Sequence, residues 1–288
     1  MDLHRNALRR LVRVLAAACM LVAGTTVATA ADSAAIERGR YIFDAAGCFG
    51  CHTGDKGEGP ALAGDRPLET PFGAFHTPNI TPDPAHGIGR WTFADFEAAM
   101  REGRRPDGSY YYPAFPYTSY TGVSDADLAD LWAYLQTVAP QPKPSQSHDL
   151  SFPFNQRWLM GVWQALFFTP GRSETPAGRS PEWQRGAYLV EVLGHCGECH
   201  SPRNAFGAVD RDAALAGNGE ADHSRVPGIR SADLRDWSEV DIATMLKSGM
   251  MPDGDFVGGE MAEVVENSTS RLTHTDRGAI AVYLKSLD

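Results

Sequence analysis

The feature that most constrains this sequence is an ordered set of motifs that occurs twice. Each copy opens with an Arg-Gly-x-Tyr segment, at residues 38–41 and 185–188, and reaches a Cys-x-x-Cys-His motif at residues 48–52 and 196–200. Each copy then has a tryptophan, a polar helical stretch and a Pro-Asp-Gly turn, with equal spacing from the tryptophan to the glycine. Because chance similarity does not keep so many features in order, the sequence predicts two homologous domains.

Each copy also ends in a predicted helix, over residues 124–137 and 273–287. Both helices begin with Ser or Thr and carry an aspartate three residues later, Asp127 and Asp276. This spacing is a variant of the capping box, in which the first hydroxyl and the later carboxylate satisfy each other's backbone N–H groups.

The Cys-x-x-Cys-His motif is the attachment signature of c-type haem. Two thiols one helical turn apart bond to the two vinyl groups of one porphyrin, and the histidine that follows places its imidazole under the iron. The sequence therefore predicts two covalently attached haem c groups. The residues predicted to hold them are Cys48, Cys51, His52, Cys196, Cys199 and His200.

Two other uses of the cysteines stay open at this point. In a four-cysteine zinc site the two cysteine pairs usually lie closer in sequence than Cys51 and Cys196 do. A disulfide or a thioredoxin-like dithiol would fit an exported protein, but neither explains why a histidine follows each pair, and no βαβ pattern surrounds them. Haem attachment explains both histidines and is the interpretation we favour.

The expected fold class is all-α, with two tandem class I cytochrome c domains joined by a Pro-rich linker that contains a short helix. In the smallest covalent haem domains the first helix crosses the last one closely. Gly39 and Gly186 lack a Cβ and permit that approach. Tyr134 and Tyr283 are expected to place a large side chain opposite each glycine. The predicted divisions are a signal peptide over residues 1–30, a first domain over 31–139, the linker over 140–181 and a second domain over 182–288.

The N-terminal segment has the pattern of a secretory signal. Four arginines precede an apolar run at residues 14–23, and residues 28–30 form a small-residue cleavage site. The run is short for a membrane anchor. Lipidation of Cys19 is disfavoured because the residues before it lack the leucine of such sites.

The charge of the mature chain constrains its partners. Cleavage leaves 22 basic and 35 acidic residues, a net charge of −13. Such a chain repels nucleic acid and anionic lipid and favours a basic patch on a protein partner. We expect a periplasmic protein, soluble or peripherally associated with the membrane, with no transmembrane span after cleavage.

The second axial ligand of each iron is predicted from the Pro-Asp-Gly turns. Met261 lies seven residues beyond the second turn, in a Gly-rich loop, and its thioether would complete His/Met ligation of the second haem. Met250 and Met251 are the local competitors. The equivalent position in the first copy is Phe115, whose ring cannot bind iron and is expected to pack against the porphyrin.

The first iron therefore lacks an obvious second ligand. His76 is the best candidate chemically, because imidazole binds haem iron well. Met100, Met160, a tyrosine of the loop at residues 110–117, or no protein ligand at all are the alternatives.

With these motifs in place, the sequence resembles the two-haem members of the family that includes the cytochrome c subunits of membrane-associated alcohol, gluconate and sorbitol dehydrogenases. Three-haem relatives have a third Cys-x-x-Cys-His domain and a membrane tail, which this sequence lacks, and many relatives have methionine where this chain has Phe115. The segments that carry the resemblance are residues 77–83, 112–117, 185–190, 196–200 and 258–264.

The resemblance implies an electron carrier rather than an enzyme. Electrons would arrive from a dehydrogenase or another cytochrome and leave to an oxidase or further carrier of a respiratory chain. The alternative is a haem enzyme whose weakly ligated first iron reacts with peroxide, nitric oxide or a sulfur compound, and Phe115 is the feature that keeps it open.

Overall fold

The computed structural model describes residues 30–54, 57–171, 178–219 and 226–288. Residues 1–29 of the predicted signal peptide, Cys19 among them, lie outside the described residues. Residues 35–288 form one compact unit.

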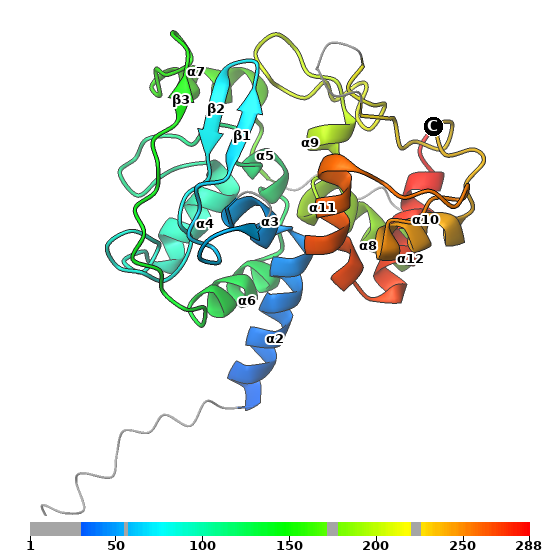
Figure 1. Ribbon diagram of the computed structural model, residues 1–288, viewed down its shortest axis with the longest axis horizontal. Helices are drawn as coiled ribbons and strands as arrows, with labels where there is room; N and C mark the ends of the chain where they lie inside the picture. The colour runs from blue at the N-terminus through cyan, green and yellow to red at the C-terminus, as the bar shows by residue number, and fades with distance from the viewer. Residues whose placement is uncertain (1–29, 55–56, 172–177, 220–225) are drawn as a thin grey trace, which may run out of the picture. The chain divides into compact units, whose positions relative to one another are not determined.

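Helices dominate this unit, as the sequence predicts (Figure 1). In chain order the helical elements are α2 (Ala30–Ala45), α3 (Cys48–His52), α4 (Phe93–Glu102), α5 (Tyr117–Tyr120), α6 (Asp125–Leu135), α7 (Leu159–Phe167), α8 (Pro181–Ala187), the π-helical turn η2 (Tyr188–Leu193), α9 (Gly197–His200), α10 (Glu239–Ser248), α11 (Gly259–Asn267), the 3-10 turn η3 (Thr269–Arg271) and α12 (His274–Lys285).

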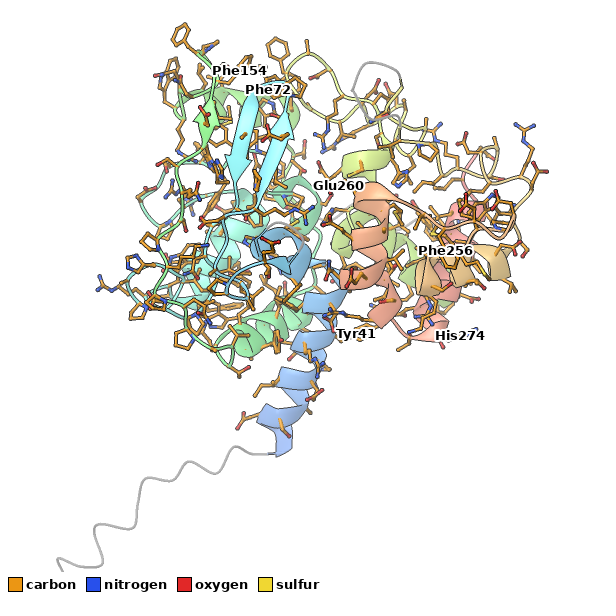
Figure 2. All side chains as sticks on the ribbon, viewed as in Figure 1. Tyr41, Phe72, Phe154, Phe256, Glu260 and His274 are labelled. Carbon is orange, nitrogen blue, oxygen red and sulfur yellow. The ribbon has the colours of Figure 1, made fainter. Side chains whose placement is uncertain are left out.

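The all-α prediction is wrong in one respect, because the structure contains a small antiparallel sheet. Its strands are β1 (Pro67–Thr70), β2 (Gly73–His76) and β3 (Asp149–Leu150), in the order β1-β2-β3. Strands this short contain too few residues to show a period of two in the sequence. Phe72, in the turn between β1 and β2, packs on Phe154 with ring centroids 4.6 Å apart (Figure 2).

The predicted close crossing of the first and last helix of each copy is confirmed. A Cβ on Gly39 would lie 1.9 Å from the Asp130 carbonyl oxygen of α6. A Cβ on Gly186 would lie 2.0 Å from the Ala279 carbonyl oxygen of α12. Real Cβ atoms do not approach backbone oxygen so closely, so any larger residue would push the helices apart in both copies.

The two copies also contact each other in a matched way. The Tyr41 hydroxyl of α2 donates to Asp276 Oδ2 of α12 at 2.5 Å, and the Tyr188 hydroxyl of η2 donates to Asp127 Oδ2 of α6 at 2.6 Å. Each tyrosine therefore binds the first turn of the other copy's last helix. Such a reciprocal pair is the pattern of a two-fold interface, here formed within one chain.

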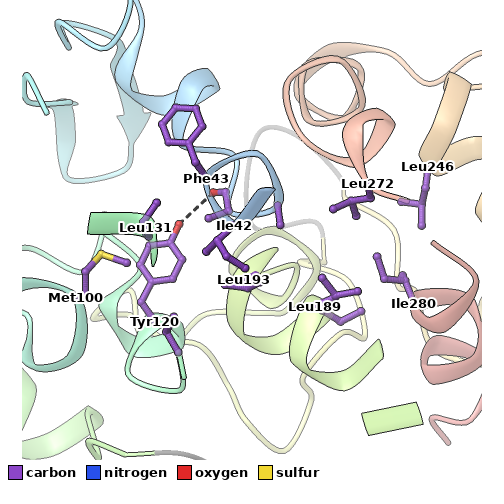
Figure 3. Close-up of a cluster of buried hydrophobic side chains, with 14 of the residues drawn as sticks. Ile42, Phe43, Met100, Tyr120, Leu131, Leu189, Leu193, Leu246, Leu272 and Ile280 are labelled. Atoms are coloured by element: carbon purple, nitrogen blue, oxygen red, sulfur yellow. Dashed lines mark hydrogen bonds between the residues drawn. The ribbon is translucent and has the colours of Figure 1, made fainter. Parts of the chain in front are cut away.

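One cluster of buried apolar side chains runs through both copies. Figure 3 shows side chains of α2 and α6 beside those of η2 and α12 in one cluster of buried residues. The members labelled in the close-up are Ile42, Phe43, Met100, Tyr120, Leu131, Leu189, Leu193, Leu246, Leu272 and Ile280.

The predicted linker contains a short helix, as expected, and this helix packs on both copies. The Trp163 indole of α7 is buried and donates to the Phe206 carbonyl at 2.9 Å. Gly161 of the same helix faces the ring of Tyr110. The other side of α7 is exposed at Val162 and Leu166, so packing covers one side of the helix.

Candidate functional site

The two Cys-x-x-Cys-His motifs form two short helices, α3 and α9. All four cysteines are free thiols. Burial raises the pKa of Cys48 and of Cys196 to about 12, so both are neutral thiols near neutral pH. Thioethers to a porphyrin would be made from reduced cysteines such as these.

The motif histidines are held in the same way in both copies. His52 Nδ1 lies 2.8 Å from the Pro78 carbonyl oxygen, and His200 Nδ1 lies 2.8 Å from the Pro227 carbonyl oxygen. A carbonyl can only accept, so Nδ1 carries the proton and donates it, which leaves the Nε2 lone pair free to bind a metal. Burial lowers the pKa of both imidazoles, which favours this neutral form.

A cavity of about 680 Å³ lies beside α3. Cys48, Cys51 and His52 line it together, so the attachment residues face a single space. This volume is in the usual range for sites that bury a cofactor-sized molecule, roughly 300–1,000 Å³. The apolar side chains that complete its walls include Phe75, Ile80, Ile88, Phe96, Leu131 and Leu135.

The candidate ligands of the first copy separate into those that line the cavity and those that do not. His76, Met100 and Phe115 all line it. Met160 packs in two neighbouring apolar clusters instead. Within the described ranges, His76 Nδ1 is buried without a hydrogen-bond partner. An orphaned buried nitrogen beside this cavity fits a ligand that the protein alone does not provide.

His148, from the predicted linker, holds the strand that carries His76. The His76 N–H donates to His148 Nδ1 at 3.1 Å. Burial, helped by the positive charge of Arg157, lowers the pKa of His148 to about 4. His148 is therefore neutral near neutral pH and keeps Nδ1 as an acceptor.

The aromatic loop, which the sequence predicts to pack against a porphyrin, lies against this cavity. Phe115 lies among Tyr111, Tyr117 and Tyr120, with ring centroids 5.3, 6.4 and 5.8 Å away. Phe115 and Tyr120 both line the cavity. The loop therefore forms an apolar aromatic wall where the second copy has Met261.

In the second copy, Met261 lies on α11 and is half-buried against the common core. Burial is the main cause that raises the pKa of Cys199. The negative charge of Glu260, the residue before Met261, lies close enough to add to that rise. Met250 and Met251 line a separate pocket of about 150 Å³ with Asp241 and Thr244.

The two attachment helices lie close to one another. Burial raises the pKa of Cys51, and charge on Cys199 adds to that rise. Arg66 is buried between the copies, where it donates to the Gly50 carbonyl at 2.8 Å and to Glu263 of α11 at 2.5 Å. Burial lowers the pKa of Arg66, but its ion pairs with the carboxylates of α11 raise the pKa by more. Arg66 therefore stays charged between the two motifs.

Two further observations concern the other uses of the cysteines that the sequence leaves open. The four cysteines are not paired in disulfides. Nor does the part of the chain that the structure describes contain a cluster of three or more His, Cys, Asp or Glu side chains arranged to hold a metal ion.

Sequence reasoning missed the residues that orient the motif histidines. Pro78 and Pro227 follow their histidines by 26 and 27 residues, and each precedes an x-Ile pair. This repeat was present in the sequence and could have been found. His148 gives no such signal, because its role depends on how residues 140–150 fold back over the sheet.

Comparisons with known proteins find similarity to cytochromes c. The Cytochrome c family profile matches residues 36–139. A protein of Cereibacter sphaeroides described as "Diheme cytochrome c-type" is 50% identical over 253 residues, which cover 86% of this chain and 84% of that protein.

Two dehydrogenase subunits are similar over most of this chain. The cytochrome c subunit of alcohol dehydrogenase (quinone) from Gluconobacter oxydans is 41% identical, over 95% of this chain and 59% of its own length. The cytochrome c subunit of gluconate 2-dehydrogenase from Pantoea cypripedii is 37% identical, over 89% of this chain and 60% of its own length. The chain thus spans about three-fifths of each subunit. It belongs to the cytochrome c family of electron-transfer proteins, in the group that includes dihaem cytochromes and the cytochrome c subunits of alcohol and gluconate dehydrogenases.

Proposed function

We propose that this protein is a periplasmic dihaem carrier that passes electrons from a dehydrogenase, or from an upstream cytochrome, towards an oxidase or other acceptor. One haem c is attached to Cys48 and Cys51, and the other to Cys196 and Cys199. Residues 31–139 and 182–288 form the two tandem haem domains, and residues 140–181 connect them.

The observation that carries this proposal is the matched support of the two motif imidazoles. His52 and His200 each donate from Nδ1 to a prolyl carbonyl at 2.8 Å. Each imidazole is thereby fixed in the tautomer and orientation that leave Nε2 available. An identical arrangement at two separate motifs supports a duplicated metal-binding role for these histidines.

When bound, haem supplies reversible one-electron exchange at iron. The chain's part is to hold, orient and shield it. His52 and His200 would each bind the iron of their own haem, and Met261 would be the second protein ligand in the second copy. In the first copy His76 is the proposed second ligand, because it lines the cavity with an unpartnered, buried Nδ1. Trp91 and Phe96 exclude water from the same space.

A dehydrogenase is the proposed electron donor because relatives of this chain are subunits of such enzymes. The predicted mature charge of −13 favours a basic patch on that partner, which would steer the encounter. Within the described residues, none of the helices is long and apolar enough to cross a membrane. The signal-like N-terminal sequence supports export to the periplasm.

Spectroscopy of the purified protein tests this function directly. A carrier is reduced and reoxidised reversibly by small redox mediators, and its spectrum is unchanged by carbon monoxide after reduction. A reduced protein that binds carbon monoxide at one haem and turns over peroxide or nitric oxide would instead favour the reactive-haem alternative.

A further inference from the structure

The residue just before the second motif has an unusual backbone. His195 has φ 37°, in the left-handed region that side chains other than glycine's rarely adopt. The equivalent residue before Cys48 is Gly47, with φ 63°. Strain of this kind persists where the surroundings require the side chain. The first copy shows that glycine is sufficient for this turn, so the second copy retains a side chain there for another reason.

The imidazole of His195 reaches into the first copy. It is one of the residues that line the cavity beside α3. Its ring stands edge-on to Tyr120, with centroids 5.5 Å apart and planes at 82°. His195 therefore belongs to the second attachment loop by sequence and to the first cavity by position.

The same imidazole is bonded to the loop that precedes the first motif. The Tyr120 hydroxyl donates to the Ala46 carbonyl at 3.1 Å (the dashed line in Figure 3). The Ala46 backbone is also a hydrogen-bond partner of the His195 side chain. Ala46 lies two residues before Cys48, and His195 is bonded directly to Cys196. One hydrogen bond and a few peptide units thus connect the two cysteine motifs.

We infer that His195 is a positioning residue that couples the two haem sites, by holding the first attachment loop against the second and by bridging the two cysteine motifs through bonds. This inference rests on the proposed function. With haem bound at both sites, the two groups would exchange one electron, and His195 would keep the two attachment loops in fixed contact during that exchange.

The test compares the mature holoprotein with two variants at this position. His195→Gly reproduces the residue of the first copy and relieves the backbone strain. His195→Phe keeps a buried ring but removes the hydrogen bond to Ala46. His274→Ala, which removes an exposed histidine from α12, is the matched control. Each protein is partly reduced by a flash-generated flavin donor, and the redistribution of electrons between the haems is followed by absorbance.

The concentration-independent phase should slow by about tenfold in both His195 variants, because both lose the imidazole that joins the two attachment loops. His274→Ala should match the wild type. Haem content and axial-ligand bands should be unchanged in His195→Gly, and its Tm should not fall. A purely structural role would lower the Tm or the haem content instead of the rate.

An unaltered exchange rate in fully loaded His195→Gly and His195→Phe would overturn the inference and leave the carrier function standing. A wild-type protein that accepts electrons reversibly at both haems but shows no concentration-independent phase would also overturn it. A wild-type protein that cannot be reduced and reoxidised would contradict the proposed function itself.

Discussion

The Tyr41 hydroxyl donates to Asp276 across the two copies of the repeat, and its partner contact runs from Tyr188 to Asp127 in the opposite sense. The backbone N–H of Thr273 donates to Tyr41 at 3.1 Å, and that of Ser124 donates to Tyr188 at 3.1 Å. In a full capping box, the aspartate three residues on would accept from this N-cap N–H. Here the tyrosine hydroxyl of the other copy accepts from it instead. The two copies are therefore joined at the N-terminal ends of their last helices.

Loss of the Asp276 carboxylate should make the stability of the protein depend less on pH in the acid range. Burial opposes ionisation of Asp276, but hydrogen bonds from Arg185 and Tyr41 outweigh it and hold the pKa of this carboxyl below its ordinary value. Because the unfolded carboxyl has a pKa of about 4, stability from Asp276 is complete above that pH and is lost as the pH falls through the lower folded value.

In Asp276→Asn that acid-dependent part is absent. The wild type should therefore lose more of its Tm between pH 7 and pH 3 than the variant does, as measured by calorimetry at fixed ionic strength. At pH 7 the variant should be less stable than the wild type by about 1–3 kcal/mol. Parallel Tm curves for the two proteins over this range would exclude the proposed role of Asp276.

The glycine at each helix crossing predicts a matched loss of stability. Gly39→Ala and Gly186→Ala place a Cβ about 2 Å from a backbone carbonyl, so each should cost about 1–3 kcal/mol or more through forced separation of the helices. Gly278→Ala is the control, since a Cβ there meets nothing within 4 Å and alanine favours the helix. Denaturant unfolding of the three variants measures the difference. A Gly39→Ala protein as stable as Gly278→Ala would contradict the close crossing.

Axial ligation predicts different spectral changes for the two copies. Met261→Leu should remove the sulfur-to-iron charge-transfer band of the oxidised protein, because leucine keeps the volume but offers no lone pair. His76→Ala should convert one haem to a high-spin form. Met100→Leu separates the candidates at the first site, since it should leave both haems as in the wild type. Loss of a low-spin haem in Met100→Leu, with His76→Ala unaffected, would assign the ligand to Met100.

Partner docking should depend strongly on salt. If the acidic surface steers the encounter with a basic patch, the second-order rate of reduction by the dehydrogenase should fall by about tenfold or more from low to physiological ionic strength. Stopped-flow measurements over a salt series give this rate. A flat rate across the series would remove electrostatic steering from the account.

Sequence reasoning identified the features that depend on local spacing. The two Cys-x-x-Cys-His helices and the crossing glycines each follow from residues that are close in sequence or repeated in order. The tyrosine exchange between copies could not be predicted, because Tyr41 and Asp276 meet only when the two copies pack together. The sheet was missed for a related reason, since β3 comes from two residues of the predicted linker.

The most direct measurement is the intact mass of the exported, matured chain beside two paired variants, Cys48→Ser/Cys51→Ser and Cys196→Ser/Cys199→Ser. We predict that the wild type carries the added mass of two haem groups, that each variant carries one, and that both masses survive denaturation. A wild-type chain with no added mass, or a variant that keeps both haem groups, would contradict the attachment of one haem to each cysteine pair.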